Sequence, residues 1–231
     1  MEEQHNATTA GLQEGIALFK KSDWKNALDV FLRVRTHSDV EKKEFMYYIG
    51  LCYAKLKHYE EAVPYLEKFI SESHESTRVY QCRMTLAYVY IMSRNAKMAE
   101  YELTILLNNG FESAQLYATM AYAAWCQSAF PRAIEWYEKA LSVDADNLTA
   151  LNGLGFILAD SGKDARRGIR FCKKAVEKAP NNPVYLDSLG WAYFMDGRIP
   201  DAKKYLYKAL SKAPDSPEIK THISIVENKK E

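Results

Sequence analysis

The sequence of 231 residues predicts an all-α protein of six helical hairpins followed by one capping helix. A small residue recurs every 34 to 37 positions, and a second small residue follows each of them after twelve or thirteen. Larger apolar residues stand three and four positions from these columns, as on one helix face. Side chains must be small where two helices cross closely, so each period is expected to hold two antiparallel helices. The first column is Gly15, Gly50, Ala87, Ala121, Gly155 and Gly190; the second is Ala27, Ala62, Ala99, Ala133, Gly168 and Ala202.

The hairpins are expected at residues 8–41, 43–76, 80–113, 114–147, 148–182 and 183–216. Residues 1–7 are expected to be frayed, as chain ends commonly are. Four prolines fall in first turns of the expected helices, where the missing N–H costs no hydrogen bond: Pro131, Pro183, Pro200 and Pro217. Within residues 217–231, Ile219, Ile223 and Val226 recur at helical spacing. They predict a capping helix that covers the apolar face of the last hairpin.

These columns resemble the tetratricopeptide repeat, whose helix-turn-helix unit carries Leu-Gly, Tyr, Ala, an aromatic residue, Ala and Pro. The best matches run from Leu154-Gly155 to Pro180 and from Leu189-Gly190-Trp191-Ala192-Tyr193 to Pro214. The weakest is 80–113, where Ala87 replaces Gly and Phe111 replaces Pro. The resemblance implies a right-handed α-solenoid superhelix with its concave wall lined by first helices. The Leu189-to-Tyr193 segment looks like bacterial members of the family, many of which are scaffold or assembly factors.

Composition excludes several function classes. The chain has 31 basic and 30 acidic side chains, a formal net charge of +1, which favours no nucleic-acid partner. No window approaches about 18 uncharged apolar residues, so no membrane span is expected. The chain is expected to be cytoplasmic, or periplasmic if a signal or lipid-attachment segment precedes it. It is expected to be a monomer or a weak homo-oligomer.

The sequence lacks the motifs of common enzymes and metal sites. It contains no GxSxG, Walker-type loop, HExxH or GxGxxG before a helix, so we expect no catalytic activity and no cofactor. The five histidines share no ligand spacing and are expected to be solvated: His5, His37, His58, His74 and His222. The four cysteines stand 30 or more residues apart and are expected to be buried free thiols: Cys52, Cys82, Cys126 and Cys172.

Function is therefore expected on the concave wall. In each repeat, the residues of this wall stand three positions before, one position after and four positions after the small residue of the first column. Peptide-binding members of the family hold a C-terminal carboxylate there with Lys and Asn, and that clamp is missing. The wall is instead apolar and aromatic, as in protein interaction hot spots. We expect a scaffold or adaptor that binds an apolar or amphipathic partner segment. The candidate partner-binding residues are Tyr47, Tyr88, Tyr122, Trp125, Phe156, Trp191 and Phe194.

Two alternatives remain open for this wall. Its aromatic residues would have only a structural role if they pack on neighbouring first helices. A closed superhelix could instead enclose an apolar cavity for a hydrophobic small molecule. Outside the wall, a basic run extends over the second helices of the last two hairpins, and an acidic protein or lipid headgroups would fit it. The simpler interpretation is a solvated helix face. The run comprises Lys163, Arg166, Arg167, Arg170, Lys173, Lys174, Lys178, Lys203, Lys204, Lys208 and Lys212.

Overall fold

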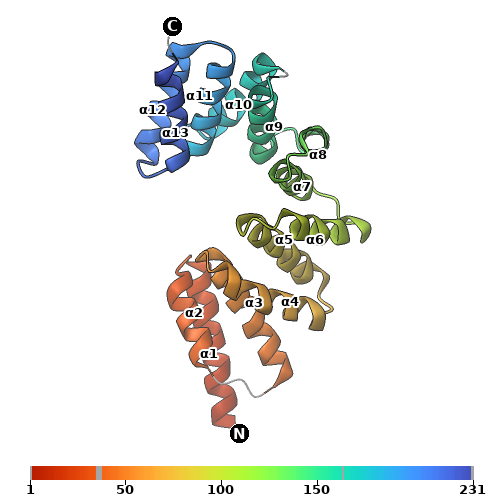
Figure 1. Cartoon of the computed structure of the whole chain (residues 1–231). Helices are drawn as coiled ribbons and strands as arrows, with labels where there is room; N and C mark the ends of the chain where they lie inside the picture. Colours follow the sequence, from red (N-terminus) through yellow and green to blue (C-terminus); the bar gives the residue numbers. More distant parts are fainter. Residues whose placement is uncertain (1, 35–37, 163, 230–231) are drawn as a thin grey trace. The chain divides into compact units, whose positions relative to one another are not determined.

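The computed structural model describes residues 2–34, 38–162 and 164–229, with side chains from residue 8 onward. All regular elements in these ranges are α-helices, which confirms the predicted all-α class. They form two compact units, Met1–Phe111 and Glu112–Glu231 (Figure 1). The first contains α1 (Glu2–Lys20), α2 (Trp24–Arg33), α3 (Asp39–Lys55), α4 (Tyr59–Glu72), α5 (Ser76–Met92) and α6 (Ala96–Asn108). The second contains α7 (Ala114–Cys126), α8 (Phe130–Val143), α9 (Leu148–Asp160), α10 (Ala165–Lys178), α11 (Pro183–Met195), α12 (Ile199–Lys212) and α13 (Pro217–Asn228).

Consecutive helices pair as hairpins, and the small columns lie where the partners cross. In the second unit α7 packs on α8, α9 on α10 and α11 on α12. A Cβ atom on Gly155 of α9 would lie 2.9 Å from the backbone oxygen of Gly168 on α10. A Cβ on Gly168 would lie 2.5 Å from the backbone oxygen of Gly155. The glycine at position 168, where the other repeats have alanine, therefore permits an especially close approach of these two helices.

Among the described residues, the turn between the two helices of each hairpin contains one residue with a positive φ angle. The six residues recur at the period of the repeat: Ser22, Lys57, Arg94, Ser128, Gly162 and Gly197. Four of them carry a side chain, although the left-handed conformation costs a residue with a Cβ roughly 1–2 kcal/mol. Backbone hydrogen bonds around the turn, such as that from the Asn95 N–H to the Tyr90 carbonyl at 2.8 Å, hold this conformation. The turn is thus set by the packing of its two helices more than by its own sequence.

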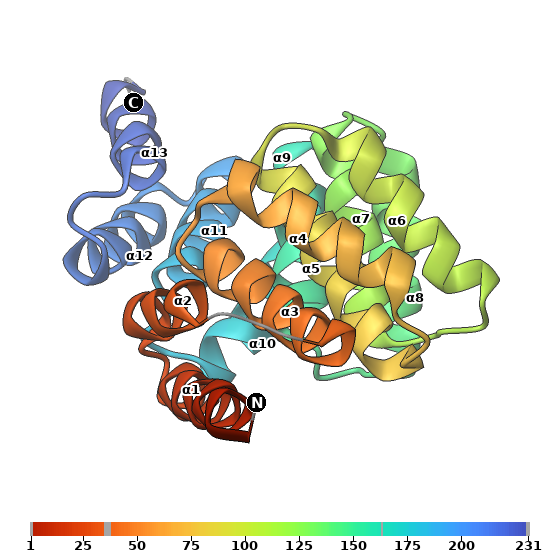
Figure 2. The same cartoon turned by 90° about the horizontal axis from the view of Figure 1, so that it is seen from below.

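Helices lie near both limits of the described part of the chain. The first helix begins at Glu2, so residues 2–7, which the sequence placed in a frayed segment, lie within α1. No proline interrupts this stretch, and Glu and Gln favour helix. At the other end, α13 packs on α12 and α11 (Figure 2). It buries three apolar side chains in the core of the last hairpin: Ile219, Ile223 and Val226.

Side-chain caps start the first helices of the second unit. The Ser113 hydroxyl accepts from the Leu116 N–H at the start of α7, and the Asn147 side chain accepts from the Ala150 N–H at the start of α9. Equivalent caps begin α11 at Asn182 and α13 at Ser216. Each cap satisfies one of the N–H groups that a helix leaves unpaired at its start. These caps therefore define where the four helices begin.

Candidate functional site

A continuous series of aromatic rings, which we call the aromatic stripe, runs across four helices of the second unit. Tyr122 and Trp125 of α7 stack with ring centroids 5.6 Å apart, and Trp125 meets Phe156 of α9 edge-on at 6.1 Å. The ring of His222 on α13 lies 6.5 Å from Phe156. The remaining contacts of the stripe are His222 with Trp191 of α11 at 4.4 Å and Trp191 with Phe194 at 5.1 Å.

The order of the helices accounts for this alignment. Helix α9 packs on α7 and α11, and α13 packs on α11. Residues at equivalent repeat positions therefore become neighbours: Tyr122, Phe156 and Trp191 each stand one residue after the first small column. Offsets of three residues within one helix add Trp125 and Phe194 to the same face. The sequence predicted these five residues for the wall, and the structure brings them together.

The stripe is partly packed and partly open to solvent. The Tyr122 side chain is 38% exposed, and Trp125, Phe156, Trp191 and Phe194 are half-buried. Each ring of the stripe therefore packs on its neighbours, as the structural interpretation requires, and also presents surface to solvent, as the binding interpretation requires. The packing limits the freedom of these side chains, which lowers the entropy cost of ordering them in a complex.

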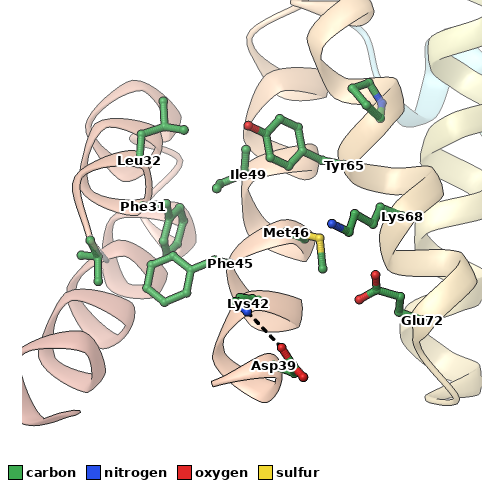
Figure 3. A pocket seen from close by; sticks show the side chains of 12 residues that line it. Phe31, Leu32, Asp39, Lys42, Phe45, Met46, Ile49, Tyr65, Lys68 and Glu72 are labelled. Carbon is green, nitrogen blue, oxygen red and sulfur yellow. Dashed lines mark hydrogen bonds and ion pairs between the residues drawn. The ribbon is translucent and has the colours of Figure 1, made fainter. Parts of the chain in front are cut away.

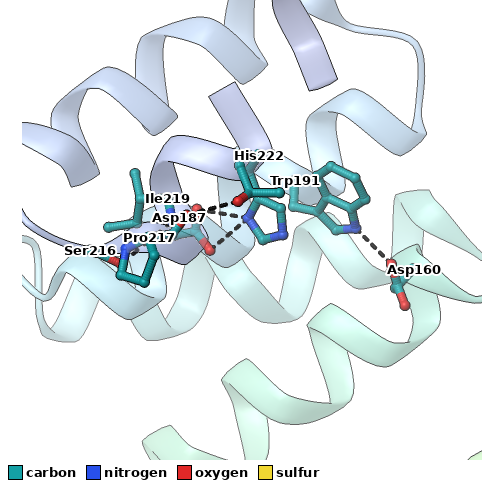
Figure 4. Close-up of polar contacts among 8 residues, drawn as sticks. Asp160, Asp187, Trp191, Ser216, Pro217, Ile219 and His222 are labelled. Atoms are coloured by element: carbon teal, nitrogen blue, oxygen red, sulfur yellow. Dashed lines mark hydrogen bonds and ion pairs between the residues drawn. The ribbon is translucent and has the colours of Figure 1, made fainter. Parts of the chain in front are cut away.

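Two carboxylates anchor the stripe (Figure 4). The indole N–H of Trp191 donates to Asp160 Oδ1 at 2.8 Å. The Nδ1 of His222 donates to the carboxylate of Asp187, lying 2.9 Å from each oxygen. Asp160 is exposed, whereas Asp187 is buried and His222 nearly so. The carboxylates thus hold the planes of Trp191 and His222 in their stacked positions.

The two candidate residues of the first unit lie in different surroundings. Tyr47 is only 6% exposed; it packs on Phe69 with centroids 5.1 Å apart and donates to Gln81 Oε1 at 2.6 Å. Burial raises its pKa to about 12. Tyr47 therefore belongs to the core of its unit. Tyr88 is 45% exposed and touches Tyr59 edge-on at 6.2 Å.

Sequence reasoning missed His222 and misplaced Cys126. His222 was expected to be solvated, yet its side chain is 18% exposed and forms the centre of the stripe. The sequence feature that indicates this position of His222 is its spacing, because it follows Asp187 by 35 residues, which is one period of the repeat. Cys126 is exposed because it ends α7, whereas Cys52, Cys82 and Cys172 are buried as expected. Of the other histidines, His58 and His74 are exposed; the side chain of His5 and all of His37 lie outside the described residues.

The basic run lies mainly on exposed positions of α10 and α12. Among the described members of the run, three form ion pairs: Arg166 with Asp196, Arg167 with Glu138, and Lys178 with Asp146. Lys163 lies outside the described residues. The exposed members are Arg166, Arg170, Lys173, Lys174, Lys178, Lys203, Lys204, Lys208 and Lys212.

A cavity of about 650 Å³ opens in the first unit, away from the predicted wall (Figure 3). Apolar side chains of α2 and α3, including Phe31, Phe45 and Ile49, form its floor. Charged groups from Lys42, with its ion-pair partner Asp39, and from Lys68 and Glu72 stand around it. None of the seven candidate partner-binding residues lines this cavity.

The described part of the chain offers no cluster of three or more His, Cys, Asp or Glu side chains that could hold a metal ion. Among its helices none combines the length and the apolar character needed to cross a bilayer.

The chain matches the tetratricopeptide repeat in three segments. Residues 44–73 and 186–216 match one sequence profile of this repeat, and residues 119–183 match another, which together make up more than half of the chain. A TPR repeat-containing protein of Pseudomonas aeruginosa is 38% identical over 80 residues. This match covers 35% of the chain and 13% of that protein, so the chain spans only a small part of the length of this relative.

Solved structures share the fold at low sequence identity. A tetratricopeptide repeat protein from Parabacteroides merdae has a TM-score of 0.75 at 14% identity, covering 96% of this chain and 84% of that one. The Cut9–Hcn1 hetero-tetramer of APC/C has a TM-score of 0.76 at 13% identity, covering 95% and 42%. YrrB, described as a TPR protein with an unusual peptide-binding site, has a TM-score of 0.54 at 16% identity, covering 81% and 92%. These likenesses concern the fold alone.

Proposed function

Because the chain belongs to the tetratricopeptide repeat family, we propose that it is a non-enzymatic interaction protein. Its second unit binds an apolar or amphipathic segment of a partner protein along the aromatic stripe. The observation that carries this proposal is the unbroken contact series from Tyr122 to Phe194, with Tyr122 38% exposed. Aromatic side chains at a solvent boundary offer large contact area at low entropy cost.

Two further points support a peptide segment as the ligand. Apolar surface that is exposed to solvent commonly marks an interaction site, and the stripe presents one exposed ring, Tyr122, beside four half-buried rings. YrrB, which shares the fold, is described as having an unusual peptide-binding site, so the fold is compatible with such a ligand. The partner-binding residues are then Tyr122, Trp125, Phe156, Trp191 and Phe194. Tyr47 is removed from the set by its burial, and Tyr88 stays a separate candidate on the first unit.

Affinity capture from native lysate, followed by mass spectrometry, tests this proposal. We expect the double variant Tyr122→Ala with Trp125→Ala to lose partners that the unaltered chain retains, because hot-spot aromatic residues contribute roughly 2 kcal/mol or more each. The control is Tyr101→Ala on α6, which removes an aromatic side chain that is 58% exposed but outside the stripe. Circular dichroism must show equal helicity for all three proteins. Capture that survives in the double variant overturns the proposal.

The second candidate is a carrier of a hydrophobic small molecule, and its support is the apolar floor of the pocket in the first unit, although this pocket is open to solvent and rimmed by charged side chains. Its volume of about 650 Å³ falls within the usual range for ligand pockets. Native mass spectrometry and solvent extraction of the purified protein test this function. A retained compound that disappears in Phe45→Ala but persists in Tyr122→Ala would place the ligand in this cavity. Protein that carries no compound from its native host speaks against the carrier.

A further inference from the structure

In the second unit, the first helices of the three hairpins carry few charged side chains, whereas the second helices carry most of the cations. Helices α7, α9 and α11 contain 13 residues each and only two charged side chains among them, Asp160 and Asp187. Helix α10 contains six basic side chains against one acidic, Glu177, and α12 contains four against Asp201. Of the helices that form the stripe, α7 is therefore uncharged and α9 and α11 each carry one carboxylate, while α13 carries Lys220 besides Glu218 and Glu227.

One of these carboxylates is available beside the stripe. Asp160 is exposed, and its Oδ1 accepts only the indole N–H of Trp191 among the hydrogen bonds and ion pairs of the described residues. A carboxylate has about four acceptor positions, so Asp160 can bind a further donor without releasing Trp191. Asp187 is already engaged by His222 and is buried. A positively charged side chain of the partner would therefore pair with Asp160 and not with Asp187.

One lysine of the chain itself lies over a ring of the stripe. The Nζ atom of Lys229, which follows α13, lies 4.8 Å from the ring centroid of Phe194. Aromatic faces attract ammonium and guanidinium groups, and the indole face does so most strongly. The exposed surface of Tyr122 and Trp125 offers the same kind of ring without a lysine from α7, α9 or α11, whereas the Trp191 indole beside Asp160 is already stacked on His222.

From this charge complementarity we infer that the segment bound along the stripe is cationic, with Lys or Arg side chains interspersed among its apolar residues. Its apolar residues contact the rings, and one of its cations pairs with Asp160. An acidic segment would bring like charge to Asp160 and lose the ring–cation attraction. This inference rests on the proposed function, because it specifies the chemistry of the ligand at the same site.

Selection from a random peptide display library tests the inference without assuming a partner. The unaltered full chain is immobilised, and peptides that also bind the Tyr122→Ala, Trp125→Ala double variant are subtracted. We expect the remaining peptides to be enriched in Lys and Arg together with apolar residues. Enrichment of acidic or uncharged peptides overturns the inference while leaving the proposed function standing. Recovery of no stripe-dependent peptide overturns both.

A matched pair of variants then tests the role of Asp160. Asp160→Asn removes the charge but keeps a side-chain oxygen that can accept the Trp191 N–H. We expect it to weaken a selected peptide about three-fold in low salt, the size of an exposed ion pair, with the difference shrinking as salt rises. Asp215→Asn removes an exposed carboxylate of the same unit in the turn between α12 and α13 and should change nothing. Equal affinity for Asp160→Asn and the unaltered chain contradicts the pairing.

Discussion

The imidazole of His222 stacks on the indole of Trp191, with ring centroids 4.4 Å apart and ring planes inclined by 23°. His222 comes from α13, the helix that the sequence predicted only as an apolar cap. The same histidine binds Asp187, one repeat earlier in the chain. The last helix thus contributes a ring to the stripe as well as covering the core.

Replacing this histidine is expected to destabilise the second unit. His222→Ala leaves the buried carboxylate of Asp187 without its donor, which costs about 1–3 kcal/mol. Chemical denaturation followed by circular dichroism measures this loss, and acrylamide quenching should show Trp191 becoming more accessible. His74→Ala, at an exposed position, is the control. Equal effects of the two substitutions would contradict the assigned role of His222.

The contact between Gly155 and Gly168 predicts the effect of a single methyl group. Gly168→Ala improves helix propensity by about 1 kcal/mol, yet its Cβ would lie 2.5 Å from the Gly155 carbonyl oxygen and 3.1 Å from the Ala159 nitrogen. We expect a net loss of about 1–3 kcal/mol in the free energy of unfolding of the second unit, because backbone atoms must move. Denaturation curves measure it.

Gly11→Ala is the comparison for this substitution. The three atoms nearest to its Cβ would all belong to the Val34 side chain, with one methyl at 2.5 Å, and that side chain can adjust more readily than a backbone carbonyl. We expect a smaller change than for Gly168→Ala. A Gly168→Ala protein as stable as the unaltered chain would show that α9 and α10 are not held at this distance.

The first unit should lose stability as pH rises above about 9, the ordinary pKa of a thiol. Burial raises the pKa of Cys52 and of Cys82 to about 12 in the folded chain. Between these values the unfolded chain releases thiol protons that the folded chain keeps, so the free energy of unfolding falls as pH rises. Urea titrations from pH 8 to pH 11 measure the slope. Replacing both cysteines by alanine should make the slope shallower, and an unchanged slope would contradict this cause.

One thiol should react much faster than the other three. Cys126 is exposed at the end of α7, whereas Cys52, Cys82 and Cys172 are buried. Partial burial raises the pKa of Cys126, so its reaction with a disulfide reagent should accelerate as pH rises through 8 and 9. The chromophore released over time should show one rapidly reacting thiol per chain. This rapid phase should be absent in Cys126→Ser. Two or more fast equivalents would contradict the described burial.

The sequence predicted the helices and the helix crossings because both depend on residues of one repeat. The small columns identified the contact of Gly155 with α10, and equivalent offsets placed Trp125, Phe156 and Trp191 on one face. The left-handed conformation of Lys57 and Arg94 was not predictable from residue type, because helix packing imposes it. Burial also depended on neighbouring repeats: Tyr47 is enclosed by Gln81 and by Arg78, whose guanidinium lies 5.0 Å from its ring.

Photo-crosslinking from Cys126 shows whether a partner segment lies along the aromatic stripe. Cys126 follows Trp125 and is exposed, so a benzophenone attached there would stand at the edge of the stripe. The comparison carries the same group on α6, at Tyr101→Cys in a Cys126→Ser chain. We expect irradiation of the captured complex to join position 126, and not position 101, to one continuous peptide of the partner. Crosslinks from position 101 alone, or the same crosslinks from both positions, would contradict it.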